Sequence, residues 1–244
     1  MKTITARGLV LREYEAGESD KRLLLLCKEL GRITVYARGA RKPKSKILAL
    51  AQLFTYADFV LAAGRGFYSV TQGDIIESFY NLRADYDRLM AAHLIAEVCE
   101  KTVLENVSCD ELLLLTLKSL SLLSKGKYPP MQISGVFLMR FFDFHGLRPQ
   151  TDACAACNYA APENMNYFSP EGILCTKCAK YKTAHPASKP ALAAVSHILK
   201  SSLSESFGFK ATDDILQEVM QIAIFLWDCH FGRELTCKWQ SPNT

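Results

Sequence analysis

Residues 31–46 read GRITVYARGARKPKSK and carry two signals from which the rest of the architecture follows. From Arg32 to Ala37, apolar and polar side chains alternate, which is typical of a half-buried β-strand. From Arg38 to Lys46, the chain has five cations together with a glycine and a proline, a composition that predicts an exposed loop. The segment therefore predicts a strand that runs into a long basic loop.

Four more strands are expected on either side of this segment. The β-rich apolar runs fall at residues 4–14, 21–28, 54–62 and 67–76. Turn-forming residues separate them at 16–20, 29–31 and 63–66. Five short strands in about 75 residues, with one long loop after the third, predict a small antiparallel barrel of the OB type.

Beyond residue 80 the apolar residues recur at helical spacing. Helices are expected at 84–105, 110–125, 129–146, 190–203 and 212–231. The sequence thus predicts an α+β fold with three parts: an OB barrel (1–80), a helical domain (81–150 and 183–244) and a cysteine module inserted in that domain (151–182). Because the helices on both sides of the insertion each have one apolar stripe, we expect them to pack together.

Positive charge is concentrated in the first third of the chain. The net charge is +4, but residues 1–80 contain 13 basic and 8 acidic side chains, and the remainder contains 16 and 17. This asymmetry indicates a polyanionic partner, and nucleic acid is favoured over membrane because no basic amphipathic helix is present. A mildly basic, merely solvated surface is the alternative.

The sequence predicts neither a membrane span nor secretion. No apolar run reaches the roughly 18 residues that a span requires. The first residues, Met1 to Ile4, lack the apolar core of a signal peptide. With 49% hydrophobic residues, the chain can bury a sizeable core. We therefore expect a cytoplasmic protein.

The nine cysteines divide into two groups. Five are scattered, mostly beside apolar residues, and are expected to pack as small hydrophobes: Cys27, Cys99, Cys109, Cys229 and Cys237. The other four form two C-x2-C pairs separated by 17 residues: Cys154, Cys157, Cys175 and Cys178. This spacing predicts a four-thiolate Zn²⁺ site, structural because no coordination position is left for water. A redox-active pair, or thiols that merely pack, are the alternatives.

The basic loop is the candidate DNA-binding site. Its five cations lie within nine residues that include no carboxylate: Arg38, Arg41, Lys42, Lys44 and Lys46. Cations at that density neutralise phosphates and would repel one another without an anionic partner, although an ordinary solvated charge run is the alternative. The aromatic residues Tyr36, Phe67 and Tyr68 on neighbouring strands are candidates for base stacking, with the barrel core as the alternative place for each.

No motif supports catalysis. The sequence has no nucleophile elbow, no phosphate-binding loop followed by a helix and no metal-chelating carboxylate cluster, and its five histidines stand apart. The acidic residues near positions 85 and 213 are placed as helix-start residues. A protein that is not an enzyme is therefore expected.

Several motifs together resemble the bacterial recombination mediator family RecO. In the first third, ESD at 18–20, ELG at 29–31 and the basic loop match the family's N-terminal pattern. In the centre, FFDFHGLRP at 141–149 leads into the cysteine pairs, and HFGREL at 230–235 is similar to the end of the family's last helix. Cys237 and Trp239 depart from the family pattern. The resemblance covers essentially the whole chain.

The resemblance implies a mediator of recombinational DNA repair that works at the nucleoid. Such proteins bind single- and double-stranded DNA, anneal complementary strands and, with RecR, help to load RecA onto DNA coated by single-strand DNA-binding protein. Contact with the acidic C-terminal tail of that coat protein would need an apolar pocket with a nearby cation. Arg140 and Arg148 are the candidate cations for that contact.

Two other functions are compatible with the residues alone. A zinc-ribbon scaffold would bind protein only, with the basic barrel incidental to its role. A thiol oxidoreductase would use Cys154 and Cys157. The salt dependence of DNA binding tests the first alternative, and a zinc assay on the purified protein tests the second.

Overall fold

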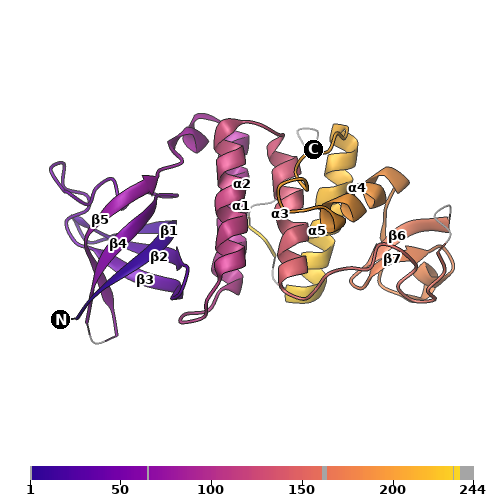
Figure 1. Cartoon of the computed structure of the whole chain (residues 1–244), viewed down its shortest axis with the longest axis horizontal. Coiled ribbons are helices and arrows are strands. Elements are labelled where there is room, and N and C mark those ends of the chain that lie inside the picture. Colours follow the sequence, from indigo (N-terminus) through magenta and orange to yellow (C-terminus); the bar gives the residue numbers. More distant parts are fainter. Residues whose placement is uncertain (1, 65, 161–163, 233, 237–244) are drawn as a thin grey trace. The chain divides into compact units, whose positions relative to one another are not determined.

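Five strands at the N-terminus close into a barrel, coloured indigo to violet in Figure 1. They are β1 (Lys2–Ala16), β2 (Asp20–Cys27), β3 (Gly31–Ala37), β4 (Tyr56–Ala63) and β5 (Tyr68–Glu77). The computed structural model describes residues 2–64, 66–160, 164–232 and 234–236. Cys237, which we expected to pack as a small hydrophobe, and Trp239 lie outside these residues. All five expected strands are present within two residues of their predicted ends.

The order of the strands is that of an OB barrel. Strand β1 pairs with both β2 and β4, β2 pairs with β3, and β4 pairs with β5, all antiparallel. A short parallel pairing of β3 with β5, at Val35–Tyr68 and Tyr36–Ser69, closes the barrel in the order β1-β2-β3-β5-β4. With the helices that follow, this confirms the predicted α+β fold.

The barrel core is formed by the inward side chains of all five strands. In β3 every second residue is buried, as the two-residue period of a strand requires. The loop between β3 and β4 contributes Ile47, Leu50 and Ala51 to the same core. This loop is therefore packed against the barrel through its second half and through Ala40, while its cations stay at the surface.

Strand β4 begins two residues later than predicted, at Tyr56. Phe54 is fully buried but has a left-handed backbone conformation with φ of 63°, so it cannot continue a strand. Its backbone N–H donates to the Val10 carbonyl at 2.9 Å, and its ring contacts His93 with 5.5 Å between ring centroids. Tertiary contacts therefore override the strand propensity of this phenylalanine.

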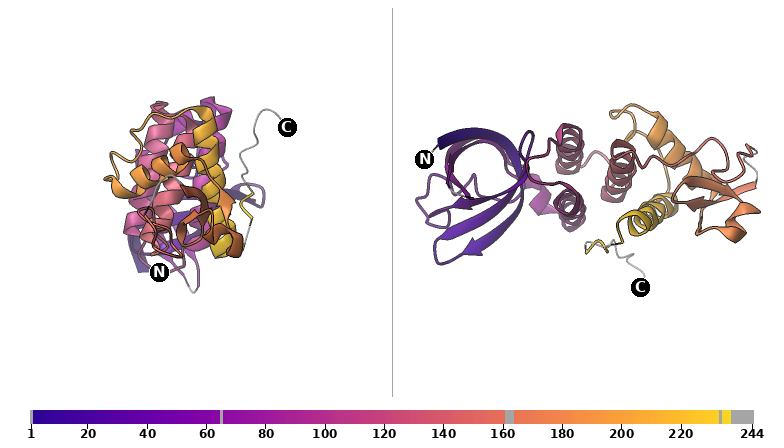
Figure 2. Two further views of the ribbon diagram at one scale, coloured as in Figure 1. Left: turned by 90° about the vertical axis from the view of Figure 1, so that its right-hand side faces the viewer. Right: turned by 90° about the horizontal axis from the view of Figure 1, so that it is seen from below.

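Two helices pack on the barrel within the same compact unit. They are α1 (Tyr86–Thr102) and α2 (Asp110–Lys125), preceded by the 3-10 turn η1 (Tyr80–Ala84), and Figure 2 (right) shows them nearly end-on beside the barrel. An ion pair joins Arg12 of β1 to Glu100 of α1. In the segment between the two helices, the Leu104 carbonyl accepts a hydrogen bond from the Arg32 backbone N–H at 3.3 Å. Helix α1 is shorter than expected at both ends: Asp85 caps its start by accepting from Arg88 N–H at 2.9 Å, and Val103 is already extended.

The second compact unit, from Lys125 onward, contains three helices and the cysteine module. The helices are α3 (Pro130–Phe144), α4 (Lys189–Lys200) and α5 (Asp213–Phe231). The ring centroid of Phe141 lies 5.8 Å from that of Trp227 and 5.7 Å from that of Phe231. The prediction that helices before and after the insertion pack together is therefore confirmed for α3 and α5.

The packing groups α1 and almost all of α2 with the barrel, up to Ser124. The predicted boundary at residue 80 separates parts of the chain that would fold on their own. Packing in the folded structure does not test independent folding, so this boundary stays a prediction. Among the described residues, no helix is both long and apolar enough to cross a bilayer.

Candidate nucleic-acid interface and metal centre

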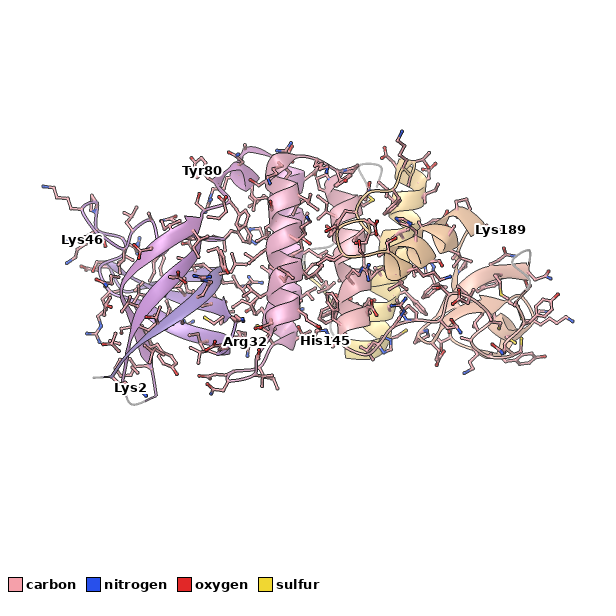
Figure 3. The ribbon with its side chains drawn as sticks, in the orientation of Figure 1. Lys2, Arg32, Lys46, Tyr80, His145 and Lys189 are labelled. Carbon is pink, nitrogen blue, oxygen red and sulfur yellow. The ribbon has the colours of Figure 1, made fainter. Side chains whose placement is uncertain are left out.

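The predicted basic loop is exposed and turned, and it holds its five cations on one short segment. Arg38, Arg41, Lys42, Lys44 and Lys46 are all exposed. Successive turns close at Lys42 N–H to the Gly39 carbonyl (3.1 Å) and at Ser45 N–H to the Lys42 carbonyl (2.9 Å). Figure 3 shows the Lys46 side chain extending away from the barrel. The structure therefore places all five predicted residues on one exposed, turned segment.

The base of the loop is fixed by Asp20, which lies at the start of β2. The Asp20 carboxylate accepts from Gly39 N–H at 2.7 Å and from the Ser19 hydroxyl at 3.2 Å. Gly39 has φ of 69°, a conformation that glycine adopts without strain. Arg41 N–H donates to the Ser19 carbonyl at 2.9 Å. Asp20 was not predicted as a site residue, although it belongs to the ESD motif at 18–20.

The five cations differ in their electrostatic surroundings. Arg41 forms an ion pair with Glu15 at 3.0 Å and donates to the Gly17 carbonyl at 3.3 Å. Within the part of the chain that the structure describes, the other four have no carboxylate oxygen within 4.0 Å: Arg38, Lys42, Lys44 and Lys46. Four cations therefore remain available to an anionic partner, and the fifth helps to attach the loop to the β1–β2 turn.

The three predicted stacking residues have different places. Tyr36 points outward from β3 and remains 40% exposed. The Phe67 ring meets the Tyr36 ring edge-on, with 6.3 Å between centroids. Tyr68 is partly buried and packs against the barrel core. Tyr36 is therefore exposed, whereas Phe67 and Tyr68 are half-buried, and Tyr68 has the core contact that the sequence left open.

The four predicted ligand cysteines converge in the second unit. Their sulfur atoms all lie within 4.8 Å of one another, and the Cys157 and Cys175 sulfurs are 3.9 Å apart. Sulfurs at the corners of a tetrahedron with 2.3 Å metal bonds would be about 3.8 Å apart. The module is a hairpin of β6 (Met165–Ser169) and β7 (Gly172–Cys175), completed by η3 (Cys178–Tyr181) and β8 (His185–Pro186). The cluster could hold a metal ion.

Backbone amides prepare this cluster for ionised sulfur. Burial opposes ionisation of Cys154, but the backbone N–H groups of Cys175, Cys157 and Ala156 outweigh it and lower the Cys154 pKa to about 6. The backbone N–H of Cys178 contributes most to lowering the pKa of Cys175. Hydrogen bonds with the Cys175 and Cys157 sulfurs raise the pKa of Cys178 to about 12. Four thiolates this close together would repel one another, so some of the thiols keep their protons. A metal cation bound among the sulfurs would displace those protons.

Arg140 and Arg148 are occupied by structural contacts. Both donate to the Asp143 carboxylate, at 3.1 Å each. Arg140 also donates to the Ser201 carbonyl, and Arg148 donates to the Leu199 carbonyl at 2.7 Å. These carbonyls belong to the C-terminal end of α4, where cations are favourable. The two arginines thus join α3 to α4.

The fold and the two sites define a class of protein, an OB-barrel protein with a cationic surface loop and a separate module whose four cysteines could hold a metal ion. Residues 1–79 match the family model described as Recombination protein O N terminal, and residues 83–238 match Recombination protein O C terminal. The chain therefore belongs to the Recombination protein O family, RecO, which confirms the resemblance found in the sequence motifs. This family has a role in DNA repair and recombination.

Curated relatives carry the same family name. The DNA repair protein RecO of Acetivibrio thermocellus is 35% identical over 225 residues, which cover 91% of this chain and 90% of the relative. The DNA repair protein RecO of Alkaliphilus metalliredigens is 35% identical over 176 residues, 72% of each chain. Similarity of this extent includes both the barrel and the helical parts.

Proposed function

We propose that this chain is a non-enzymatic, cytoplasmic mediator of recombinational repair that binds single- and double-stranded DNA through the loop from Arg38 to Lys46. The observation that carries the proposal is the set of four loop cations without a carboxylate partner among the described residues. Backbone phosphates are present in every sequence and in both strand states. A loop that contacts only phosphates therefore suits a protein that must act anywhere in a genome.

The same electrostatics support strand annealing. Two complementary strands repel each other through their phosphates, and a protein that neutralises phosphates on both lowers that repulsion. The loop is anchored at Asp20 and by its buried residues Ile47 and Leu50, so less of its backbone has to be ordered when its cations bind DNA. We propose that annealing, and loading of RecA together with RecR, start from this capture of DNA at the nucleoid.

An interaction with the acidic C-terminal tail of single-strand DNA-binding protein is part of this proposal. A hollow of about 350 Å³ lies between the metal module and α4, and it is lined by Met165, Ile173 and Leu192 with Lys189 beside them. Asp152 also lines the hollow, but its carboxylate is paired with Lys200. Apolar walls with Lys189 beside them suit a short acidic peptide. Arg140 and Arg148 are not part of this proposal because their guanidinium groups are engaged within the fold.

We propose that the four-cysteine cluster holds Zn²⁺ in a structural role. Four thiolates are the donor set that a tetrahedral structural zinc site uses, and they leave no position for substrate or water. Zinc would supply folding free energy to residues 151–182, where the strands β6 and β7 have only five and four residues. This proposal also retains the predicted three-part domain organisation, with the barrel (1–80) as the DNA-binding domain.

The loop is tested by replacing four of its cations together: Arg38→Ala, Arg41→Ala, Lys42→Ala and Lys44→Ala. We expect single-strand binding to weaken uniformly across sequences, on the order of tenfold at low salt. The slope of log affinity against log salt should fall by about 0.7 for each phosphate contact that is lost. Filter binding across a salt series measures both quantities.

A matched variant separates the loop from net charge. Lys125→Ala, Lys180→Ala, Lys182→Ala and Lys210→Ala together remove the same charge from exposed positions of the second unit. We expect this variant to keep the affinity and the salt slope of the unaltered protein. A folded loop variant that binds DNA as well as this control would show that the DNA site lies elsewhere.

A further inference from the structure

An outward-facing row of side chains crosses the first three strands. The pairing places Tyr14 of β1 opposite Arg22 of β2, and Arg22 opposite Tyr36 of β3. The next pair along, Leu23 and Val35, is fully buried in the barrel core. Because side chains alternate between the two faces of a sheet, the row lies on the outer face. Tyr14 is 39% exposed and Tyr36 is 40% exposed.

The row is held in place by contacts among its own members. The guanidinium carbon of Arg22 lies 5.0 Å from the centroid of the Tyr14 ring. At the other end, Phe67 meets Tyr36 edge-on at 6.3 Å. The Phe67 ring is itself packed on Gly64, where a Cβ would come within 2.6 Å of its ring carbon Cζ. Three aromatic rings and one planar cation are thus prearranged on one surface.

A hollow of about 630 Å³ adjoins this row. Tyr14, Arg22 and Phe67 line it together with Leu24 and Thr34 of the sheet face. This volume is within the range of pockets that bind small organic groups. At the end formed by α1 and the segment after it, Glu100 and Glu105 line the hollow. Glu100 is paired with Arg12, and Arg32 also lines the hollow, so the charge at that end is mixed.

We propose that Tyr14, Arg22, Tyr36 and Phe67 form a base-stacking platform that binds single-stranded nucleic acid and not duplex. The proposal rests on the proposed function, DNA binding by the barrel, and assigns its base-contacting surface. Every base has a π-face, so aromatic rings and guanidinium planes bind bases with little sequence preference. In a duplex those faces are stacked on each other and are not accessible.

The platform and the basic loop therefore have different ligands. Arg38 follows Tyr36 by two residues, so the cationic loop begins where the row ends on β3. Adjacent strands are about 4.8 Å apart, which spaces Tyr14, Arg22 and Tyr36 across a surface suited to two or three bases. The loop would hold phosphates of either DNA form, and the platform would add affinity for single strands alone.

The test compares three probes of equal length: oligothymidine, the same backbone with abasic sites throughout, and a duplex. We expect the unaltered protein to bind oligothymidine at least about tenfold more tightly than the abasic strand, because stacking contributes to affinity base by base. The variant Tyr14→Leu with Tyr36→Leu should lose this difference and keep its affinity for the duplex. The variant Tyr14→Phe with Tyr36→Phe should retain the difference, since the rings remain.

Tyr86→Leu is the matched control, because Tyr86 is 75% exposed and begins α1, whereas Glu100 of the hollow is near its end. At 1.5 Å per residue the two positions are about 21 Å apart along the helix. Equal affinity of the unaltered protein for oligothymidine and the abasic strand would overturn the platform without using any variant. A folded double leucine variant that keeps the preference would overturn it as well. Failure to bind any of the three probes would instead contradict the proposed function.

Discussion

A single carboxylate determines how the basic loop is presented. Asp20 accepts from Gly39 N–H at 2.7 Å, one residue after the first cation of the loop. Without this bond, the first half of the loop would keep the backbone hydrogen bond of Arg41 to the Ser19 carbonyl, the buried Ala40 and the partly exposed ion pair of Arg41 with Glu15. Exposed ion pairs contribute little stability. Asp20 is therefore a positioning residue for the loop, through its hydrogen bond with Gly39 N–H.

We predict that Asp20→Ala lowers both stability and DNA affinity. Loss of hydrogen bonds to a carboxylate should reduce the free energy of unfolding by about 1–2 kcal/mol, measured by urea denaturation. Freed loop cations would have to be ordered on binding, so DNA affinity should fall several-fold at constant salt slope. Glu18→Ala, at an exposed position of the same turn, is the control. An unchanged rate of hydrogen exchange at the Gly39 amide in Asp20→Ala would contradict this role.

The contact between the barrel and the α1–α2 hairpin depends on one glycine at the start of β3. Gly31 has φ of 62°, and a Cβ there would overlap the backbone carbonyl oxygens of Leu104 and Val107. The segment between the two helices can approach the barrel so closely only because this side chain is absent. It also accepts from Arg32 N–H, and its Asn106 N–H donates to the Leu30 carbonyl at 2.8 Å.

We predict that Gly31→Ala destabilises the first unit by more than about 2 kcal/mol. The left-handed conformation alone costs a non-glycine residue about 1–2 kcal/mol, and displacement of the helix connection adds to this cost. Gly17→Ala is a matched control because Gly17 has φ of 70° with no atom within 4 Å of its Cβ position. Urea denaturation should show only the conformational cost for Gly17→Ala. Equal losses in the two variants would mean that the close contact at Gly31 is unimportant.

Strands, helices and the cysteine cluster could be predicted because their signals are local. The alternation in β3 and the two C-x2-C pairs lie within a few residues of the structures that they specify. The start of β4 could not be predicted in this way. Phe54 has the side chain of a strand residue, but its contacts with Val10 and His93 are far away in the sequence.

The stacking row was missed for a related reason. Tyr36 and Phe67 were candidates from composition, but Tyr14 and Arg22 were not. A β-bulge between Val10 and Arg12 shifts the register of β1 and so determines which residue lies opposite Arg22. Register of this kind depends on pairing between strands and cannot be found in one strand's sequence.

The two compact units contain sites of different chemistry, and this difference allows them to be separated by experiment. The cationic loop and the aromatic row belong to the first unit, and the four cysteines belong to the second. The barrel has a core contributed by all five strands, whereas the module around the cysteines has strands of only four and five residues. A large core folds without a metal, but a small hairpin depends on one.

We therefore predict that a chelator affects the module and spares the barrel. Removal of one zinc ion per chain should accelerate hydrogen exchange in residues 151–182 and leave exchange in β1 to β3 unchanged. Duplex DNA binding should persist, since the loop that we propose to contact phosphates belongs to the first unit and the cysteines belong to the second. Cys154→Ser should lose the metal without a chelator, whereas Cys229→Ser should keep it, because Cys229 is an exposed thiol outside the cluster. Cooperative unfolding of the barrel strands on metal removal would contradict this independence and would mean that the metal module stabilises the entire chain.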